Sequence, residues 1–257
     1  MPAFFERLSP TSFRATSMTE GAWDPGQMHV APGMSLLVHA IETDRDQRRD
    51  DRPRITRVSV DILGPAPVGE VEVDVRVRRP GRTIELVEAA MRHGGRDVLL
   101  ARAWLQQEYD TASIAGTPLT PIPSPDQLPE HDAAAGWSGA FAHSLHARLR
   151  ELAPGHGHFW LRSDTPLVEG EPVSPTAAAF RVIDVANGMV PLVPPSAANF
   201  PNLDLTVHLF RAPGEGWVGF DKTATIGAGG IGLTRCTLHD ADGPFGSAAQ
   251  VLTVRMR

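Results

Sequence analysis

The carboxylate with the clearest chemical potential in the sequence is Asp204, in the segment NLDLTVHLF. Apolar and polar residues alternate there, which predicts a strand whose successive side chains point to opposite faces. A carboxylate at the start of a strand can act as a general base on water if polar neighbours hold that water. The alternative is an exposed strand residue or a structural hydrogen bond, and the segment alone does not decide between them.

Three glycines, Gly227, Gly229 and Gly232, form a G-x-G-x-x-G motif in IGAGGIGLTRC. This motif binds a dinucleotide where it connects a strand to a helix, because the helix N-terminus holds the pyrophosphate. The residues that follow, LTRCTLHDADG, alternate and then turn, so they predict a strand. We therefore reject a dinucleotide site and interpret the glycines as a bend or a close backbone contact within a sheet.

Other reactive groups give weaker patterns. Cys236 is the only cysteine, which excludes an internal disulfide, and we expect it to pack in a strand. The segment GWSGA lacks the final glycine of a nucleophilic serine elbow. The histidines of HSLH (143–146) and HGH (156–158) have no clear Asp or Glu ligand pattern beside them, so we predict neither a metal site nor a cofactor.

The composition limits the classes of partner. The chain has 257 residues, of which 42% are hydrophobic and 21% charged, as in ordinary globular proteins. Its formal net charge of −6 argues against nucleic acid, which needs a basic surface. No apolar run reaches the roughly 20 residues that span a bilayer, and Glu6 and Arg7 stand where a signal peptide would be apolar. We therefore expect a cytoplasmic protein with neither a nucleic-acid partner nor a membrane span.

The chain contains an internal repeat. VSVDILGPAPVGE resembles LTVHLFRAPGEGW, so that Val60 matches Val207 at an offset of 147 residues (207 − 60). The same offset matches Asp204 with Arg57, so the candidate carboxylate occurs in one copy alone. Each copy reads as strands, one helix and further strands. This order predicts an α+β fold with two antiparallel sheets, each wrapped around one buried helix and joined edge to edge as a pseudo-dimer.

Two helices are expected, at about 32–43 and 174–187. The second has clear boundary signals, with Ser174 as its N-cap, Pro175 at its first position and Gly188 just beyond its end.

Two further segments are expected to be irregular. The charged run TDRDQRRDDRPR (43–54) predicts a solvated loop, with a site for a phosphate-bearing ligand as the alternative. The Pro-rich segment 116–136 predicts a linker between copies at 1–115 and 137–257.

The order and spacing of these segments resemble the double hot-dog acyl-CoA thioesterases, the acyl-CoA thioesterase II (TesB-like) family and its actinobacterial-type relatives. The resemblance covers Phe4 to Arg255, and its best segments are GAWDPGQMHVAPG, DILGPAPVGEVEV, GRTIELVEAAM, PLVEGEPVSP, NLDLTVHLFR and TLHDADGPFGSAAQVL. It implies a double hot-dog fold, an acyl-CoA substrate, hydrolysis to free acid and CoA, and a place in fatty acid metabolism. The alternative is a non-catalytic acyl-thioester-binding protein of the same fold, and a homo-oligomer stays open. A hot-dog hydratase is disfavoured, because Asp204 and His208 lie on a predicted strand.

The resemblance also implies a catalytic set. The family holds a nucleophilic water with an Asp, a Thr or Ser, and a Gln, which match Asp204, Thr225 and Gln250. Thr223 is the alternative hydroxyl. In this assignment Asp204 polarises the water, and backbone N–H groups at a helix N-terminus stabilise the oxyanion.

The segment MHVAPG is expected to contact the substrate through His29, Val30, Ala31 and Gly33. Relatives usually carry a Gly-Gly pair where this chain has Val30 and Ala31. A glycine pair lets a carbonyl approach the backbone closely, because it has no Cβ. The two side chains therefore predict a narrower cleft and slower turnover.

Overall fold

The computed structural model describes residues 2–135 and 137–257, so Gly136, the last residue of the predicted linker, lies outside them. The first half contains β1 (Phe5–Arg7), β2 (Ser12–Ala15), α1 (Val30–Arg48), β3 (Arg54–Ile62), β4 (Glu70–Arg79), β5 (Ile84–His93) and β6 (Arg96–Gln106). The second contains β7 (Glu130–His131), α2 (Ala140–His143), β8 (Leu145–Ala153), β9 (His156–Ser163), α3 (Pro175–Ile183), β10 (Ala198–Asn199), β11 (Asp204–Leu209), β12 (Val218–Ile226), β13 (Ile231–Asp240), β14 (Gly243–Thr253) and β15 (Arg255–Met256). Short 3-10 turns are η1 (Ser17–Thr19), η2 (Ala112–Ile114), η3 (Pro125–Gln127) and η4 (Asp184–Asn187).

The main sheet is a single antiparallel one of 13 strands, in the order β1-β2-β4-β5-β6-β3-β11-β14-β13-β12-β9-β8-β7. The strand order is symmetric about the β3–β11 junction. Outward from β3 come β6, β5 and β4 of the first half, and outward from β11 come the corresponding strands β14, β13 and β12 of the second half. At the junction Val58 pairs with Val207 and Val60 pairs with Leu205. These two pairs exchange under the 147-residue offset, as a pseudo-twofold axis at the junction requires. The continuous sheet covers the two edges that separate halves would expose.

Helix α1 is longer than predicted. The loop expected at 43–54 is wrong for its first part, because α1 continues to Arg48. Arg48 pairs with Asp44 one turn earlier, with 2.7 Å between Nε and Oδ2, and also reaches Glu85 on β5 at 2.8 Å. These ion pairs satisfy the charges of the last turn, so the segment folds as helix rather than as free loop.

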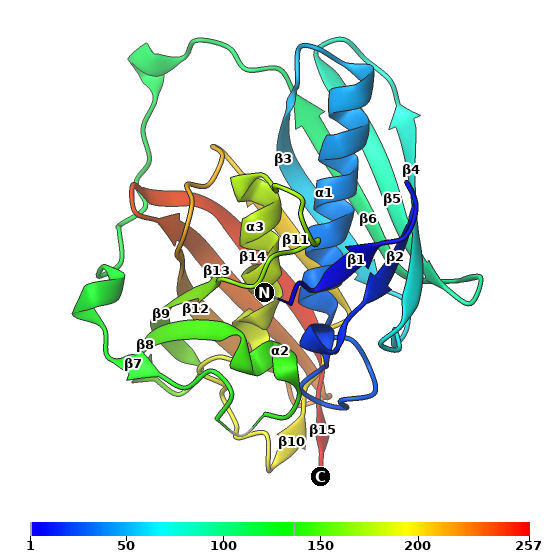
Figure 1. The fold of residues 1–257 in the computed structure, drawn as a ribbon. Coiled ribbons are helices and arrows are strands. Elements are labelled where there is room, and N and C mark those ends of the chain that lie inside the picture. The colour runs from blue at the N-terminus through cyan, green and yellow to red at the C-terminus, as the bar shows by residue number, and fades with distance from the viewer. Residues whose placement is uncertain (1, 136) are drawn as a thin grey trace.

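Helix α3 begins as predicted, and Ser174 Oγ accepts a hydrogen bond from the backbone N–H of Ala177 at 3.0 Å. The α-helix ends at Ile183 and continues as η4, so the predicted range 174–187 joins two helix types. Helices α1 and α3 pack against each other, and Ser35 Oγ donates to the carbonyl of Ala177 across their contact. Figure 1 shows the pair lying side by side against the sheet.

The glycine motif lies in a hairpin turn between β12 and β13, so no helix starts there. Gly227 N–H donates to the carbonyl of Ile231, and Gly230 has a φ of +77° that favours glycine. The prediction that a strand follows these glycines is confirmed, because β13 begins at Ile231. Among the described residues, no helix combines the length and the apolar character that crossing a bilayer requires.

Candidate active site

One end of the α1–α3 pair brings together polar groups from four segments. His29 is the N-cap residue of α1, and Asp184 lies where α3 changes to η4. Asn202 precedes β11, and Gln250 lies on the helix-facing side of β14. Asp184 and Gln250 are 2% and 1% exposed, so their polar atoms depend on protein partners or on what enters a cavity.

The carboxylate of Asp184 is held by neutral amides. Its Oδ1 accepts from Asn202 Nδ2 at 2.7 Å and from Gln250 Nε2 at 3.0 Å. Gln250 Nε2 also donates to the backbone carbonyl of Asp184 at 3.0 Å. Asn187 Nδ2 lies 3.4 Å from Asn202 Oδ1 and extends the network. The amides fix Oδ1 in place and leave Oδ2 for other contacts.

The two titratable groups of this site shift in opposite directions. Burial raises the pKa of Asp184 to about 6, against the opposing effect of the hydrogen bonds from Asn202 and Gln250. Burial lowers the pKa of His29 to about 4, so this imidazole is neutral at pH 7. His29 Nδ1 lies 4.0 Å from Asp184 Oδ2, too far for a hydrogen bond. A carboxyl that titrates near neutral pH is suited to general acid–base chemistry.

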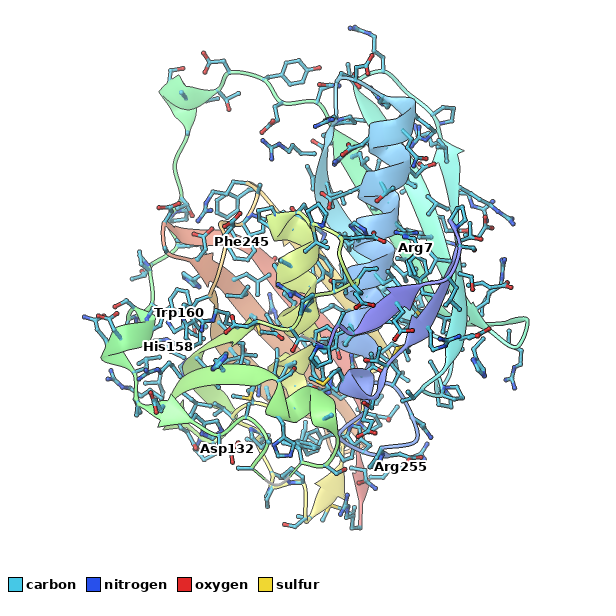
Figure 2. The ribbon with its side chains drawn as sticks, in the orientation of Figure 1. Arg7, Asp132, His158, Trp160, Phe245 and Arg255 are labelled. Atoms are coloured by element: carbon cyan, nitrogen blue, oxygen red, sulfur yellow. The ribbon has the colours of Figure 1, made fainter. Side chains whose placement is uncertain are left out.

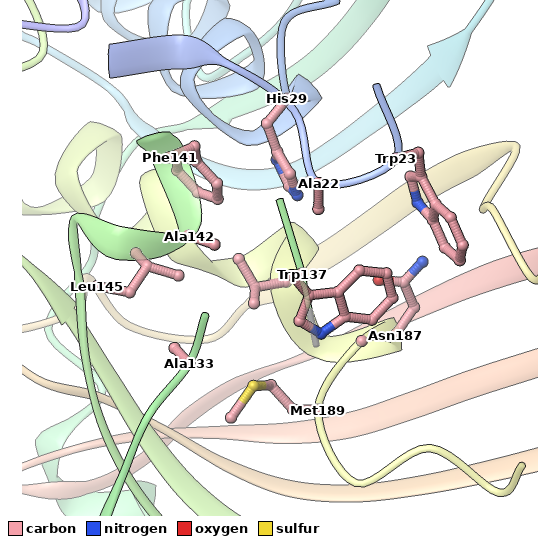
Figure 3. Close-up of a pocket in the computed structure, with 12 residues that line it drawn as sticks. Ala22, Trp23, His29, Ala133, Trp137, Phe141, Ala142, Leu145, Asn187 and Met189 are labelled. Atoms are coloured by element: carbon pink, nitrogen blue, oxygen red, sulfur yellow. The ribbon is translucent and has the colours of Figure 1, made fainter. Parts of the chain in front are cut away.

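Two cavities meet at this network. A cavity of about 210 Å³ is lined by Asp184, Asn202, His29 and Val30, among others. A smaller apolar cavity of about 40 Å³ shares His29 and Asn187 with it. Figure 3 shows the apolar cavity, where the His29 ring lies beside Phe141 and two tryptophans border the opposite side. The ring centroids of His29 and Phe141 are 4.1 Å apart and the rings are stacked.

The structure does not bring Asp204, Thr225 and Gln250 together. In neighbouring strands Thr225 pairs with Leu233, and Leu233 pairs with Val251. Thr225 is exposed and Val251 is 39% exposed, so this row faces away from the helices.

Gln250 belongs to the next row and faces the helices, because neighbouring residues of a strand point to opposite faces. Asp204 Oδ1 accepts from the backbone N–H of Val251 at 2.7 Å, which is the structural hydrogen bond that the sequence left open. Thr223, the alternative hydroxyl, is also exposed. The residue opposite Gln250 on β13 is Thr234, which is buried and whose Oγ1 has no hydrogen-bond partner among the described residues.

The expected substrate-binding residues divide into two groups. His29 and Val30 line the larger cavity. Ala31 is fully buried, and its N–H donates to His29 Nδ1 at 3.2 Å. A Cβ on Gly33 would lie 2.8 Å from Leu99 Cδ1, so Gly33 permits close packing of α1 on β6.

The sequence reasoning missed Asp184 and Asn202. Asp184 stands in the apolar stretch AFRVIDVANG, whose composition predicts a buried helix and nothing more. Carboxylates are seldom buried without a partner, so an Asp within a predicted core helix was the available signal. For Asn202 the sequence offers no comparable signal, because its position depends on the tertiary fold.

The comparisons with known proteins agree with this architecture. Residues 19–106 match the family model of the acyl-CoA thioesterase N-terminal domain, and residues 119–254 match that of the C-terminal domain. A comparison with curated protein sequences gives no significant match.

Solved structures with low sequence identity share the fold. A candidate thioesterase from Novosphingobium aromaticivorans is 19% identical with a TM-score of 0.75, and the alignment covers 98% of each chain. A hot-dog protein of unknown function from Alicyclobacillus acidocaldarius is 16% identical with a TM-score of 0.75, covering 98% of this chain and 95% of that one. The acyl-CoA thioesterase II TesB2 from Mycobacterium marinum is 16% identical with a TM-score of 0.69, covering 98% and 96%.

The family models cover both halves, and the solved structures place the α+β architecture in the hot-dog class. The chain therefore belongs to the acyl-CoA thioesterase family and is a thioester hydrolase.

Proposed function

We propose that this protein hydrolyses acyl-CoA thioesters with a water molecule activated by Asp184. The observation that carries the proposal is the environment of this carboxylate. One oxygen is held by two amides, the residue borders the larger cavity, and the pKa is raised to about 6. At neutral pH the group is then ionised, yet basic enough to take a proton.

Gln250 is proposed to hold the same water. In the part of the chain that the structure describes, its buried Oε1 has no hydrogen-bond partner. A water that donates one hydrogen to Asp184 and the other to Gln250 keeps a lone pair free for attack. Asn202 takes the place that the family resemblance gives to a Thr or Ser, because its amide orients the carboxylate.

The proposed reaction balances without a cofactor. The water oxygen bonds to the thioester carbonyl carbon while Asp184 accepts the proton. The tetrahedral intermediate then expels the CoA sulfur as the C–S bond breaks, and the proton on Asp184 neutralises the thiolate. The products are the free acid and CoA.

The developing oxyanion is proposed to face the N-terminus of α1. This 19-residue helix begins at Val30, which lines the cavity. Because the Ala31 N–H donates to His29 Nδ1 and Pro32 has no N–H, the Val30 N–H is the proposed backbone donor, at the positive end of the helix dipole. Because His29 Nδ1 accepts from Ala31, the neutral ring carries its hydrogen on Nε2 and can donate a further hydrogen bond.

The apolar cavity is proposed to receive the acyl group. Trp137, Phe141, Leu145 and Met189 line it, and their apolar surfaces are suited to the first carbons of an acyl group, which is what a cavity of about 40 Å³ can hold. Since it joins the polar cavity at His29 and Asn187, the acyl carbon would enter beside Asp184.

We also propose the double hot-dog division of the chain, with halves at 1–115 and 137–257 and a linker at 116–136, whose short strand β7 pairs with β8 at the edge of the second half. In support, α1 packs on β4, β5 and β6, whereas α3 contacts β9 and β12. Assembly into a homo-oligomer stays a prediction, to be measured by light scattering.

The direct test is thiol release across acyl-CoAs from acetyl to palmitoyl, with aryl-CoAs included. We expect a preferred acyl class, and a loss of turnover on it in Asp184→Asn. If the unmodified protein binds acyl-CoA but releases no thiol from any of them, the proposed function fails.

A further inference from the structure

A second cluster of reactive side chains lies on the outer face of the sheet, away from the helices. His156 and His158 are two residues apart on β9, so their side chains point to the same face. Asp221 on β12 pairs directly with His158 in the neighbouring strand. We name these three residues the β9–β12 cluster. The sequence could not reveal it, because the carboxylate lies far along the chain from the HGH segment.

The distances within the β9–β12 cluster approach those of a metal site. Asp221 Oδ1 lies 3.6 Å from His156 Nε2 and 3.5 Å from His158 Nε2. One ligand atom from each residue lies within 4.8 Å of the others. Ligands at 2.0–2.1 Å from a tetrahedral zinc ion are separated by about 3.3 Å. Small side-chain rotations would therefore bring the three atoms into coordination.

The surroundings of the cluster permit an ion to enter. The side chains of His156, His158 and Asp221 are 44%, 20% and 40% exposed, so the cluster is open on one side. Arg150 lies opposite His158 on β8, but its Nη2 donates to the backbone carbonyl of Gln127 at 2.9 Å. Figure 2 labels His158 on the side of the second half distant from α1.

We propose that the β9–β12 cluster binds a first-row divalent cation, with Zn²⁺ as the best fit. Two imidazoles and one carboxylate are ligands that Zn²⁺ and its neighbours accept, and water completes the coordination. The ion would join β9 to β12 across the sheet. The thioesterase reaction does not use it, because the cluster lies on the opposite face from Asp184.

The test is a titration of the untagged, EDTA-treated and desalted protein with Co²⁺, followed by visible absorption, and then competition by Zn²⁺. Variants are His156→Ala, His158→Ala and Asp221→Asn. The matched control is His146→Ala, which removes a histidine that pairs with the single carboxylate of Asp164 at 3.1 Å.

We expect one Co²⁺ per chain, displaced by Zn²⁺, and affinity at least about tenfold lower in each cluster variant but unchanged in the control. Saturating Zn²⁺ should raise the Tm of the unmodified protein by about 5 °C. Since the cluster is half-exposed, circular dichroism should show that the variants fold. Binding absent from the unmodified protein, or equal in all four variants, would overturn the proposal.

Discussion

The two ends of the α1–α3 pair are related by the internal repeat, yet they differ in chemistry. At the catalytic end, the α1 N-cap His29 lies near Asp184 of α3. At the opposite end, the α3 N-cap Ser174 hydrogen-bonds Glu42 of α1. Each end thus combines a capping residue of one helix with a buried carboxylate of the other.

The carboxylates at the opposite end have arginine partners. Arg45 lies 3.6 Å from Glu42, and Arg7 holds Glu171 at 2.8 Å. At the catalytic end, no arginine or lysine among the described residues forms an ion pair with Asp184. An arginine partner favours the ionised carboxylate, yet burial raises the pKa of Glu42 even beside Arg45. Burial also raises the pKa of Asp184, and there only the hydrogen bonds from neutral amides oppose it.

The sheet positions that face the two ends differ as well. At the 147-residue offset, Asn202 matches Ile55 and Gln250 matches Ala103. Both first-half residues are buried in the apolar core. The first half therefore uses these positions for packing, whereas the second half uses them to orient a carboxylate.

The largest expected effect is the difference in kcat/KM between the Asp184→Asn and Asp204→Asn variants. Asp184→Asn keeps the hydrogen-bonding shape and removes the base, so kcat/KM should fall by about 10²- to 10⁴-fold. Asp204→Asn is the matched control, because the Asp204 carboxylate accepts a hydrogen bond from the backbone N–H of Val251. Steady-state thiol release on the best acyl-CoA measures both. A large loss in Asp204→Asn with an unaffected Asp184→Asn would restore the assignment expected from the sequence.

The next effect concerns Gln250. Gln250→Met keeps the approximate volume but removes the hydrogen bond to Asp184 and the unpartnered oxygen. A hydrogen bond to a charged group contributes about 1.5–3 kcal/mol, so we expect kcat to fall by about 10- to 100-fold. The control is Ala103→Ser at the matching position of the first half, which should leave kcat unchanged. Equal kcat values in Gln250→Met and the unmodified protein would exclude Gln250 from holding the water.

The pH dependence follows from the raised pKa of Asp184. Because the carboxyl must be ionised to act as a base, kcat/KM should be level above pH 6 and fall about tenfold per unit below it. His29, with a pKa lowered to about 4, stays largely neutral above pH 5 and adds no second step there. A rate profile from pH 4.5 to 8 measures the midpoint. A midpoint near 4 would indicate a base whose pKa is not raised.

The repeat and the strand alternation predicted much of the fold from the sequence. The offset between Val60 and Val207 anticipated the symmetric strand order, and Ser174 anticipated the start of α3. The site residues were harder to predict from the sequence. The repeat shows which positions correspond in the two halves, but it does not show which face of a strand a side chain occupies. Asp204 and Gln250 lie on adjacent strands but point to opposite faces, and only the pairing register distinguishes them.

The smallest expected effect concerns the entrance at the α1 N-terminus. Val30 lines the larger cavity, whereas Ala31 is fully buried and hydrogen-bonded to His29. The slower turnover predicted from the side chains of Val30 and Ala31 should therefore come from Val30. Val30→Gly removes a branched side chain from the path of the thioester carbonyl, and kcat/KM should rise by up to about tenfold, or ~1.4 kcal/mol. The gain is limited because glycine also destabilises the first turn of α1.

Ala31→Gly is the control for the Val30 variant. It changes the same helix turn without altering the cavity wall, so kcat/KM should stay within about twofold of the unmodified protein. Measuring both variants on short and long acyl-CoAs separates a steric effect, which depends on the acyl group, from a change in the helix, which affects all substrates alike. If Val30→Gly gives no gain on any acyl-CoA while its Tm stays close to that of Ala31→Gly, the Val30 side chain does not restrict the approach of the carbonyl. The backbone N–H of residue 30 would then be equally accessible with valine or glycine at this position.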